Sequence, residues 1–224
     1  MRAMFIIGSP HGARSTSNSL ADRLVKHLEE VGWETVKAMA GRAMSPTELN
    51  GRAVECLESD LLVIASPLYV DQLPSPCIEF MEAIRRESGG PGRRPDLAAV
   101  INCGFPEASQ NRVALLICHE FALACGMTWR GGLSLGAGPM VGGRPLDQLG
   151  GALRNVATAL DIAGEALSRG EDISERAYEL MSRRMFPTRL YAMMGNRMWR
   201  KAARGNGVLG MIDDTPLSER GPRG

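Results

Sequence analysis

The sequence of 224 residues lacks several patterns that would each point to a class of protein. It has no apolar run that approaches the roughly 20 residues of a membrane-spanning helix. Its five cysteines are an odd number without a C-x-x-C pair, which excludes the common zinc and iron–sulfur spacings. Its three histidines are too scattered for a local metal motif. We therefore expect no metal centre, and free thiols in a reducing compartment.

Two phosphate-binding signatures are also missing from the N-terminal region. The first loop has no G-x-x-x-x-G-K-[ST], so no lysine is present there to hold the end of a triphosphate. It has no G-x-G-x-x-G either, which a dinucleotide site needs for close approach to the pyrophosphate. No signal peptide precedes the first predicted strand, so we expect a cytoplasmic protein.

The net charge of +1 hides an uneven distribution. Residues 1–182 carry 17 basic and 22 acidic groups, whereas residues 183–204 carry seven basic groups and no acidic one. The segment 183–204 is therefore a cationic patch on a mildly acidic body.

Strand and helix patterns alternate along most of the chain. Strands are predicted at 3–8, 34–38, 61–65, 97–101 and 129–135, and helices at 18–31, 47–57, 75–87, 109–125 and 147–168. This alternation implies an α/β fold with a doubly wound five-stranded parallel sheet in the order 2-1-3-4-5. Residues 171–224 depart from the alternation. We assign 1–170 to the sheet domain and 171–224 to a helical C-terminal extension, basic at 183–204 and frayed at its end.

The loop after the first strand is rich in hydroxyl groups. Ser9, Ser15, Thr16 and Ser17 lie between a buried strand and an amphipathic helix. A helix N-terminus offers unpaired N–H groups and a partial positive charge, and hydroxyls donate to phosphate oxygens. The alternative is that Ser17 or Asn18 only caps the helix. We favour a phosphate site, and hydroxyls in place of glycines suit a terminal monophosphate such as that of FMN.

Two further loops should meet this one at the carboxyl ends of the strands. In the loop after the third strand, Pro67 stiffens the chain and Tyr69 offers a rigid aromatic face, or packs on the domain. In the loop after the fourth strand, Gly104 permits close approach to a ligand and Phe105 stacks on it or anchors the loop. Glu107 accepts from a ribityl hydroxyl or favours the next helix electrostatically.

Three motifs in order resemble the flavodoxin-like NAD(P)H-dependent FMN oxidoreductases, most of all the FMN reductase and quinone reductase branch. They are Gly8-Ser9-Pro10 with Ser15-Thr16-Ser17, Ser66-Pro67-Leu68-Tyr69, and Cys103-Gly104-Phe105-Pro106-Glu107. The resemblance covers residues 3–168. It implies that Ser9, Ser15, Thr16 and Ser17 hold the FMN phosphate, and that Pro67, Leu68, Tyr69, Val70, Cys103, Gly104 and Phe105 line the flavin ring. His11 stands where relatives often carry Arg or Lys, so either Arg14 supplies that charge or neutral donors alone hold the phosphate.

The resemblance implies an FMN-dependent oxidoreductase that passes hydride from NADH or NADPH through the flavin to a small acceptor. We expect no obligatory catalytic side chain, because the cofactor carries the chemistry. Quinone, azo dye, nitroaromatic, iron chelate and free flavin all accept from the same ring. The alternatives are a flavodoxin-like electron carrier, which the near-neutral charge disfavours, and a flavin-free module.

Two segments are predicted to make contacts beyond the site. The basic segment 183–204 is interleaved with apolar residues, so it would rest on an anionic membrane surface, reach a dinucleotide phosphate, wrap a second subunit, or pack on its own sheet. We favour packing or subunit wrapping there. The helix at 109–125 is apolar nearly all round, so a homodimer contact or the C-terminal extension would cover its second side. We expect no nucleic-acid partner.

Overall fold

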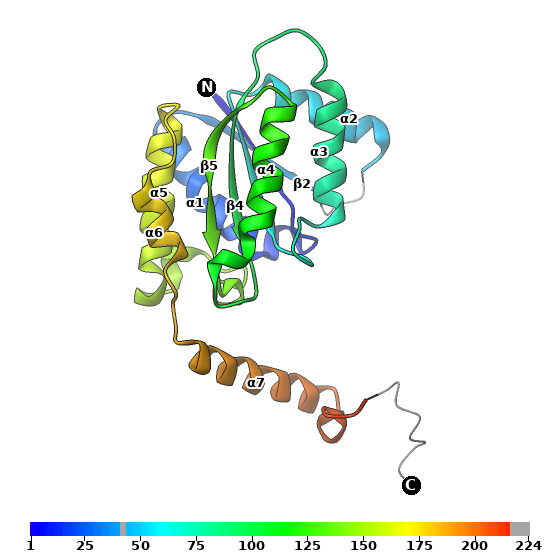
Figure 1. The fold of residues 1–224 in the computed structure, drawn as a ribbon, viewed down its shortest axis with the longest axis vertical. Coiled ribbons are helices and arrows are strands. Elements are labelled where there is room, and N and C mark those ends of the chain that lie inside the picture. Colours follow the sequence, from blue (N-terminus) through cyan, green and yellow to red (C-terminus); the bar gives the residue numbers. More distant parts are fainter. Residues whose placement is uncertain (41–43, 216–224) are drawn as a thin grey trace. The chain divides into compact units, whose positions relative to one another are not determined.

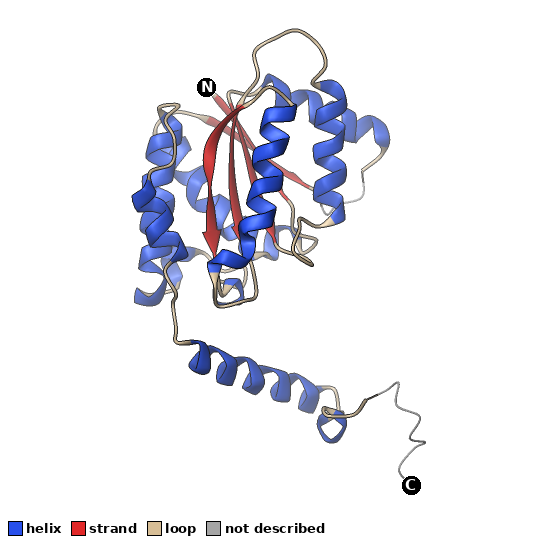
Figure 2. Cartoon of the chain, in the orientation of Figure 1, coloured by secondary structure: helices blue, strands red, loops and turns tan. Residues whose placement is uncertain are grey.

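The computed structural model describes residues 1–40 and 44–215, and its first unit is built on one sheet (Figure 1). Five parallel strands pair in the order β2-β1-β3-β4-β5, as predicted (Figure 2). Their bounds are Arg2–Ile7 for β1, Glu34–Met39 for β2, Leu61–Pro67 for β3, Asp96–Asn102 for β4 and Thr128–Leu135 for β5. The predicted α/β class, with its doubly wound order, is confirmed.

Strand β1 is an interior strand of the sheet, and both of its faces are buried. Alternate side chains of a strand point to opposite faces of the sheet. Ala3, Phe5 and Ile7 belong to one apolar cluster, and Met4 and Ile6 belong to the other. All five are fully buried, which explains why this strand reads as a continuous apolar run instead of an alternating one.

Helices cover both faces of the sheet (Figure 2). One face carries α1 (Thr16–Glu30), α5 (Arg154–Ser168) and α6 (Glu175–Ser182), and the other carries α2 (Pro46–Glu58), α3 (Ser75–Glu87) and α4 (Arg112–Ala124). Arg23 of α1 joins α5 directly, because its guanidinium contacts both carboxylate oxygens of Asp161, at 2.6 and 2.7 Å. Residues 171–185, which the sequence analysis placed in the C-terminal extension, pack as part of this first unit.

Several predicted helix starts shift in the structure. The helix predicted from residue 18 begins at Thr16, and its cap is Ser15, not Ser17 or Asn18. The helix predicted from residue 147 begins at Arg154, after two short 3-10 turns at Leu146–Gln148 and Gly151–Leu153. Gly150 separates those turns with a φ of +64°, a conformation that no α-helix contains. Apolar periodicity alone does not detect such an interruption.

Helix α4 is covered on one side only within the described chain. Ala114, Cys118 and Phe121 are buried, whereas Val113, Leu116 and Leu123 are each about half exposed. This exposed stripe is the surface to which the homodimer prediction applied, and the homodimer stays a prediction.

The second unit comprises residues 186 onward and contains α7 (Thr188–Gly205), followed by a 3-10 turn at Leu209–Met211. No residue of α7 is buried. Among the described residues, no helix combines the length and apolarity needed to cross a bilayer.

Candidate functional site

One cavity of about 390 Å³ lies where the loops after β1, β3, β4 and β5 meet. This volume is within the range of small-molecule sites. Its lining comprises Ser9, His11, Arg14, Ser15, Thr16, Ser17, Pro67, Leu68, Tyr69, Asn102, Cys103, Gly104, Pro139 and Gly142. Ten of the thirteen residues predicted for the cofactor are in this set, and Val70, Phe105 and Glu107 are not.

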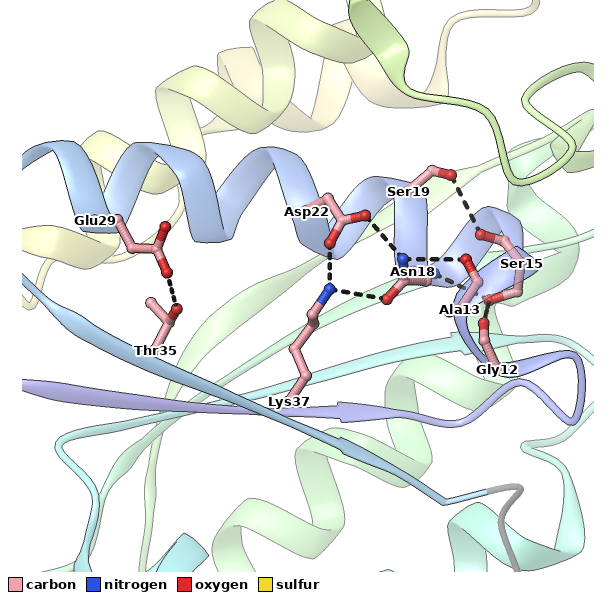
Figure 3. Close-up of polar contacts among 9 residues, drawn as sticks. All are labelled: Gly12, Ala13, Ser15, Asn18, Ser19, Asp22, Glu29, Thr35 and Lys37. Atoms are coloured by element: carbon pink, nitrogen blue, oxygen red, sulfur yellow. Dashed lines mark hydrogen bonds and ion pairs between the residues drawn. The ribbon is translucent and has the colours of Figure 1, made fainter.

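The loop after β1 is held rigidly by its own polar groups (Figure 3). The Ser15 hydroxyl donates to the Gly12 carbonyl at 2.6 Å and accepts from the Asn18 N–H at 3.1 Å. The Asn18 amide donates to the Ala13 carbonyl and to Asp22, and Lys37 of β2 donates to both Asn18 and Asp22. The loop therefore has its shape before any ligand enters.

The N–H groups at the start of α1 are available to a ligand. Thr16 and Ser17 line the cavity, and their backbone N–H groups have no partner among the described residues. The first N–H groups of a helix cannot bond within the helix, and they favour an anion. Arg14, exposed at the same cavity, adds a positive charge.

The hydroxyls of the four residues predicted to hold the phosphate form two pairs, which differ in whether the hydroxyl donates a hydrogen bond within the chain. Ser15 and Thr16 donate to carbonyls, Ser15 to Gly12 and Thr16 to Gly138 at 2.9 Å. Ser9 and Ser17 only accept, Ser9 from the His11 N–H and Ser17 from the Asn102 amide at 2.8 Å. The Ser9 and Ser17 hydroxyl hydrogens thus have no acceptor in the described chain, and with the two free N–H groups they form a donor set that fits a phosphate monoester.

Asn102 is a site residue that the sequence analysis did not select. It is buried, and its amide donates to the Ser17 hydroxyl and to the Ser66 carbonyl at 3.1 Å. The backbone carbonyl of Asn102 accepts from the Leu68 N–H at 2.8 Å. Asn102 therefore ties three loops together at the cavity. A polar residue that ends an apolar strand was the signal available in the sequence.

The glycine-rich segment after β5 forms a fourth wall, with Pro139 and Gly142, which the sequence analysis also missed. A Cβ at Gly143 would overlap the Arg14 carbonyl, and one at Gly138 would lie 2.8 Å from Asn102 Oδ1. Only glycine allows this segment to lie so close to the loop after β1.

The loop after β3 ends in a tight hairpin. The Tyr69 N–H donates to the Gln72 carbonyl at 2.8 Å, and the Gln72 N–H donates back at 3.1 Å. Val70 and Asp71 between them have φ of +48° and +61°, which is the signature of a type I′ turn. Val70 is 94 % exposed at the tip, so its backbone N–H is accessible although its side chain lies outside the cavity lining.

The loop after β4 contributes a small apolar wall. Burial raises the pKa of the Cys103 thiol, so the group stays protonated at neutral pH and is not a nucleophile. Its sulfur lies 3.6 Å from the carbonyl oxygens of Phe105 and Glu107. The Glu107 carboxylate accepts from Arg184 at 3.1 Å, and the Phe105 carbonyl accepts from the Ala137 N–H at 2.6 Å. Among the described residues no cluster of His, Cys, Asp and Glu is placed to hold a metal ion.

Comparisons with known proteins bear on the fold. No protein-family model matches the chain, and no curated protein does. Solved structures that are similar include a flavodoxin from Streptococcus pneumoniae, at 14 % identity and a TM-score of 0.55, covering 76 % of this chain and 99 % of that one. An FMN-dependent NADH-azoreductase from Bacillus anthracis is 12 % identical with a TM-score of 0.54, covering 75 % and 100 %.

An NAD(P)H:quinone oxidoreductase from Methanothermobacter marburgensis is also similar, at 12 % identity and a TM-score of 0.54, covering 75 % of this chain and 96 % of that one. At such identities the likeness concerns the fold. The chain therefore has the flavodoxin-like fold, shared with a flavodoxin and with oxidoreductases, as the resemblance in the sequence implied.

Proposed function

We propose that the protein is an FMN-dependent oxidoreductase that takes hydride from NADH or NADPH and reduces a small acceptor such as a quinone or free flavin. The observation that carries this proposal is the donor set at the start of α1. The N–H groups of Thr16 and Ser17 and the hydroxyls of Ser9 and Ser17 have no acceptor among the described residues, and all four groups belong to residues that line one cavity.

The remaining walls of the cavity suit the flavin ring. Pro67, Leu68 and Tyr69 provide apolar and aromatic surface, and Cys103 and Gly104 provide a small wall. Tyr69 remains 42 % exposed, so a second planar molecule has access to the same place. Two structural neighbours support the proposed use of FMN and a nicotinamide, because one is described as an FMN-dependent NADH-azoreductase and the other as an NAD(P)H:quinone oxidoreductase.

The protein's own part in the reaction is binding and orientation. When bound, FMN supplies the chemistry that accepts hydride and releases two electrons. The start of α1 would hold the phosphate, Asn102 ties together the loops that would surround the ring, and the backbone N–H of Val70 would stabilise negative charge on the reduced ring.

The test is anaerobic mixing of FMN-loaded protein with NADH and, separately, with NADPH, followed by addition of a quinone. We expect loss of the oxidised flavin absorbance with one nicotinamide and its return with the quinone. Reduction by dithionite but by neither nicotinamide would assign the protein as an electron carrier instead. Failure to bind FMN at all would contradict both assignments.

Three substitutions test the absence of an obligatory catalytic side chain. Tyr69→Phe, His11→Ala and Glu107→Gln should each keep turnover within about tenfold of the parent, since general acid–base catalysis typically contributes more than that. If any one of them abolished turnover while FMN stayed bound, that residue would have a direct catalytic role.

A further inference from the structure

The second unit presents a helix with two chemically different faces. At about 3.6 residues per turn, Tyr191, Met194, Met198, Trp199 and Ala202 of α7 fall on one side. The cations of the helix fall on the other, and they are Arg189, Arg197, Arg200, Lys201 and Arg204. Leu190 and Met193 are the two larger apolar residues on the basic side. No acidic residue occurs in α7.

The apolar side of α7 is exposed. Trp199 is 73 % exposed and Met198 is 62 % exposed, and the same unit exposes Val208 and Met211 beyond the helix. Asp213 and Asp214 are the first acidic residues that follow. An exposed face that carries tryptophan and methionine beside a row of cations is characteristic of a binding face.

We propose that α7 lies on anionic lipid membranes, with its apolar side in the headgroup region and its basic side against the lipid charges. A helix with a strongly basic face, low overall hydrophobicity and an aromatic residue on the apolar face has the composition of interfacial helices. Nucleic acid would engage the cations but leave Met198 and Trp199 in water. The charge row complements lipid phosphates, and the described part of α7 has no carboxylate that would oppose them.

This inference is independent of the proposed function, because it involves no residue of the cavity. The helix is about 27 Å long, which is enough for five cations to contact several lipid headgroups at once. Each cation near an anionic surface strengthens binding about fivefold, and salt screens this part of the attraction. Trp199 anchors the helix through its apolar area, which salt does not weaken.

The test is co-sedimentation of the full-length protein with vesicles of phosphatidylcholine and phosphatidylglycerol in equal parts, and with phosphatidylcholine vesicles alone. We expect binding to the anionic vesicles that weakens as salt is raised, and little binding to the neutral ones. Trp199 fluorescence should shift to the blue on binding. The Trp199→Phe variant should lose this shift, since Trp33 and Trp129 belong to the first unit.

Matched variants distinguish a lipid-inserted face from general charge attraction. Met198 and Met193 are both 62 % exposed and lie on opposite sides of α7. Met198→Gln should weaken vesicle binding about tenfold, and Met193→Gln should change it much less. Arg197→Glu/Lys201→Glu should abolish binding, whereas Arg86→Glu/Arg112→Glu, which alters the net charge equally on exposed residues of α3 and α4, should not.

Three outcomes would overturn the proposal. The first is no binding to anionic vesicles at low salt. The second is an equal loss in Met198→Gln and Met193→Gln, which would mean that no face of the helix is selected. The third is a dimer in solution that Met198→Gln dissociates while vesicles fail to bind, which would assign the apolar side of α7 to a second copy of the chain.

Discussion

At the residue scale, the most unusual backbone lies at Val70. A β-branched side chain with φ of +48° is a rare outlier, because its Cβ crowds the backbone in the left-handed region. The turn is held in place by the paired hydrogen bonds between Tyr69 and Gln72. The strain is located at the rim of the cavity, where the backbone N–H of Val70 is exposed.

Replacing Val70 by asparagine should stabilise the fold. Asparagine adopts the left-handed region readily and is favoured in type I′ turns, so we expect the free energy of unfolding to rise by about 1 kcal/mol. Urea denaturation measures this change. Val113→Asn, on the regular helix α4, is the control and should give no gain. A loss of stability in Val70→Asn would mean that the valine side chain makes a contact worth more than the strain.

The sequence was informative about the residues of the candidate site only in part. It identified the hydroxyls of the first loop, because Ser9, Ser15, Thr16 and Ser17 are close together in the chain. It did not show which of them remain free to donate, because Thr16 donates to Gly138, which lies 122 residues away, and Ser17 accepts from Asn102, 85 residues away. Such pairings are decided by the tertiary fold.

At the scale of elements, α6 covers the edge strand β5. A Cβ at Gly131 would lie 2.6 Å from the Tyr178 hydroxyl, and the Gly132 N–H donates to that hydroxyl at 3.1 Å. The strand pairing shifts register next to these glycines, because Leu97 pairs with Trp129 and Ala98 pairs with Gly131, so that Arg130 is the extra residue of a bulge. The two glycines in the predicted strand therefore indicate two features, a bulge in β5 and the close approach of α6.

Tyr178→Phe should destabilise the protein by about 1–2 kcal/mol, because it leaves the buried Gly132 N–H without an acceptor. Thermal and urea unfolding report this directly. Tyr191→Phe in α7 is the matched control, and it should leave the unfolding of the sheet unit unchanged. An unaltered stability in Tyr178→Phe would show that water replaces the hydroxyl at no cost.

At the scale of the whole molecule, the chain comprises two units, one up to Met185 and one from Phe186. Apolar periodicity predicted the strands and helices of the first unit, and their alternation along the chain predicted the sheet order. The sequence analysis ended the sheet domain at residue 170, whereas the first unit extends to Met185. Ala177, Leu180 and Met181 are buried against its core, although they follow the last strand–helix repeat.

Truncating the chain at two different residues should therefore give proteins of different stability. A chain that ends at Met185 should keep its unfolding midpoint and its affinity for FMN, whereas a chain that ends at Gly170 should be much less stable, because it lacks α6. Burying an apolar side chain contributes about 1.5–3 kcal/mol, and the shorter chain loses several such residues. Calorimetry and FMN titration of the two chains give the answer. Equal stability of the two would contradict the packing of α6 described above.

The central claim is that free N–H groups at the start of α1 bind the phosphate of FMN, and substitutions at Thr16 test it most directly. Proline is tolerated at the first helical position, and Ser15, with ψ of 154°, already has the extended backbone that precedes proline. Thr16→Ala removes only the hydroxyl, whereas Thr16→Pro also removes the N–H. The two variants should have similar unfolding midpoints.

The decisive measurement is the ratio of the dissociation constants for riboflavin, which has no phosphate, and FMN. We expect Thr16→Ala to keep a strong preference for FMN, and Thr16→Pro to lose about tenfold or more of it, as for a hydrogen bond to a charged group, with riboflavin affinity unchanged. The same ratio in both variants, or a parent protein that binds riboflavin as tightly as FMN, would contradict the account.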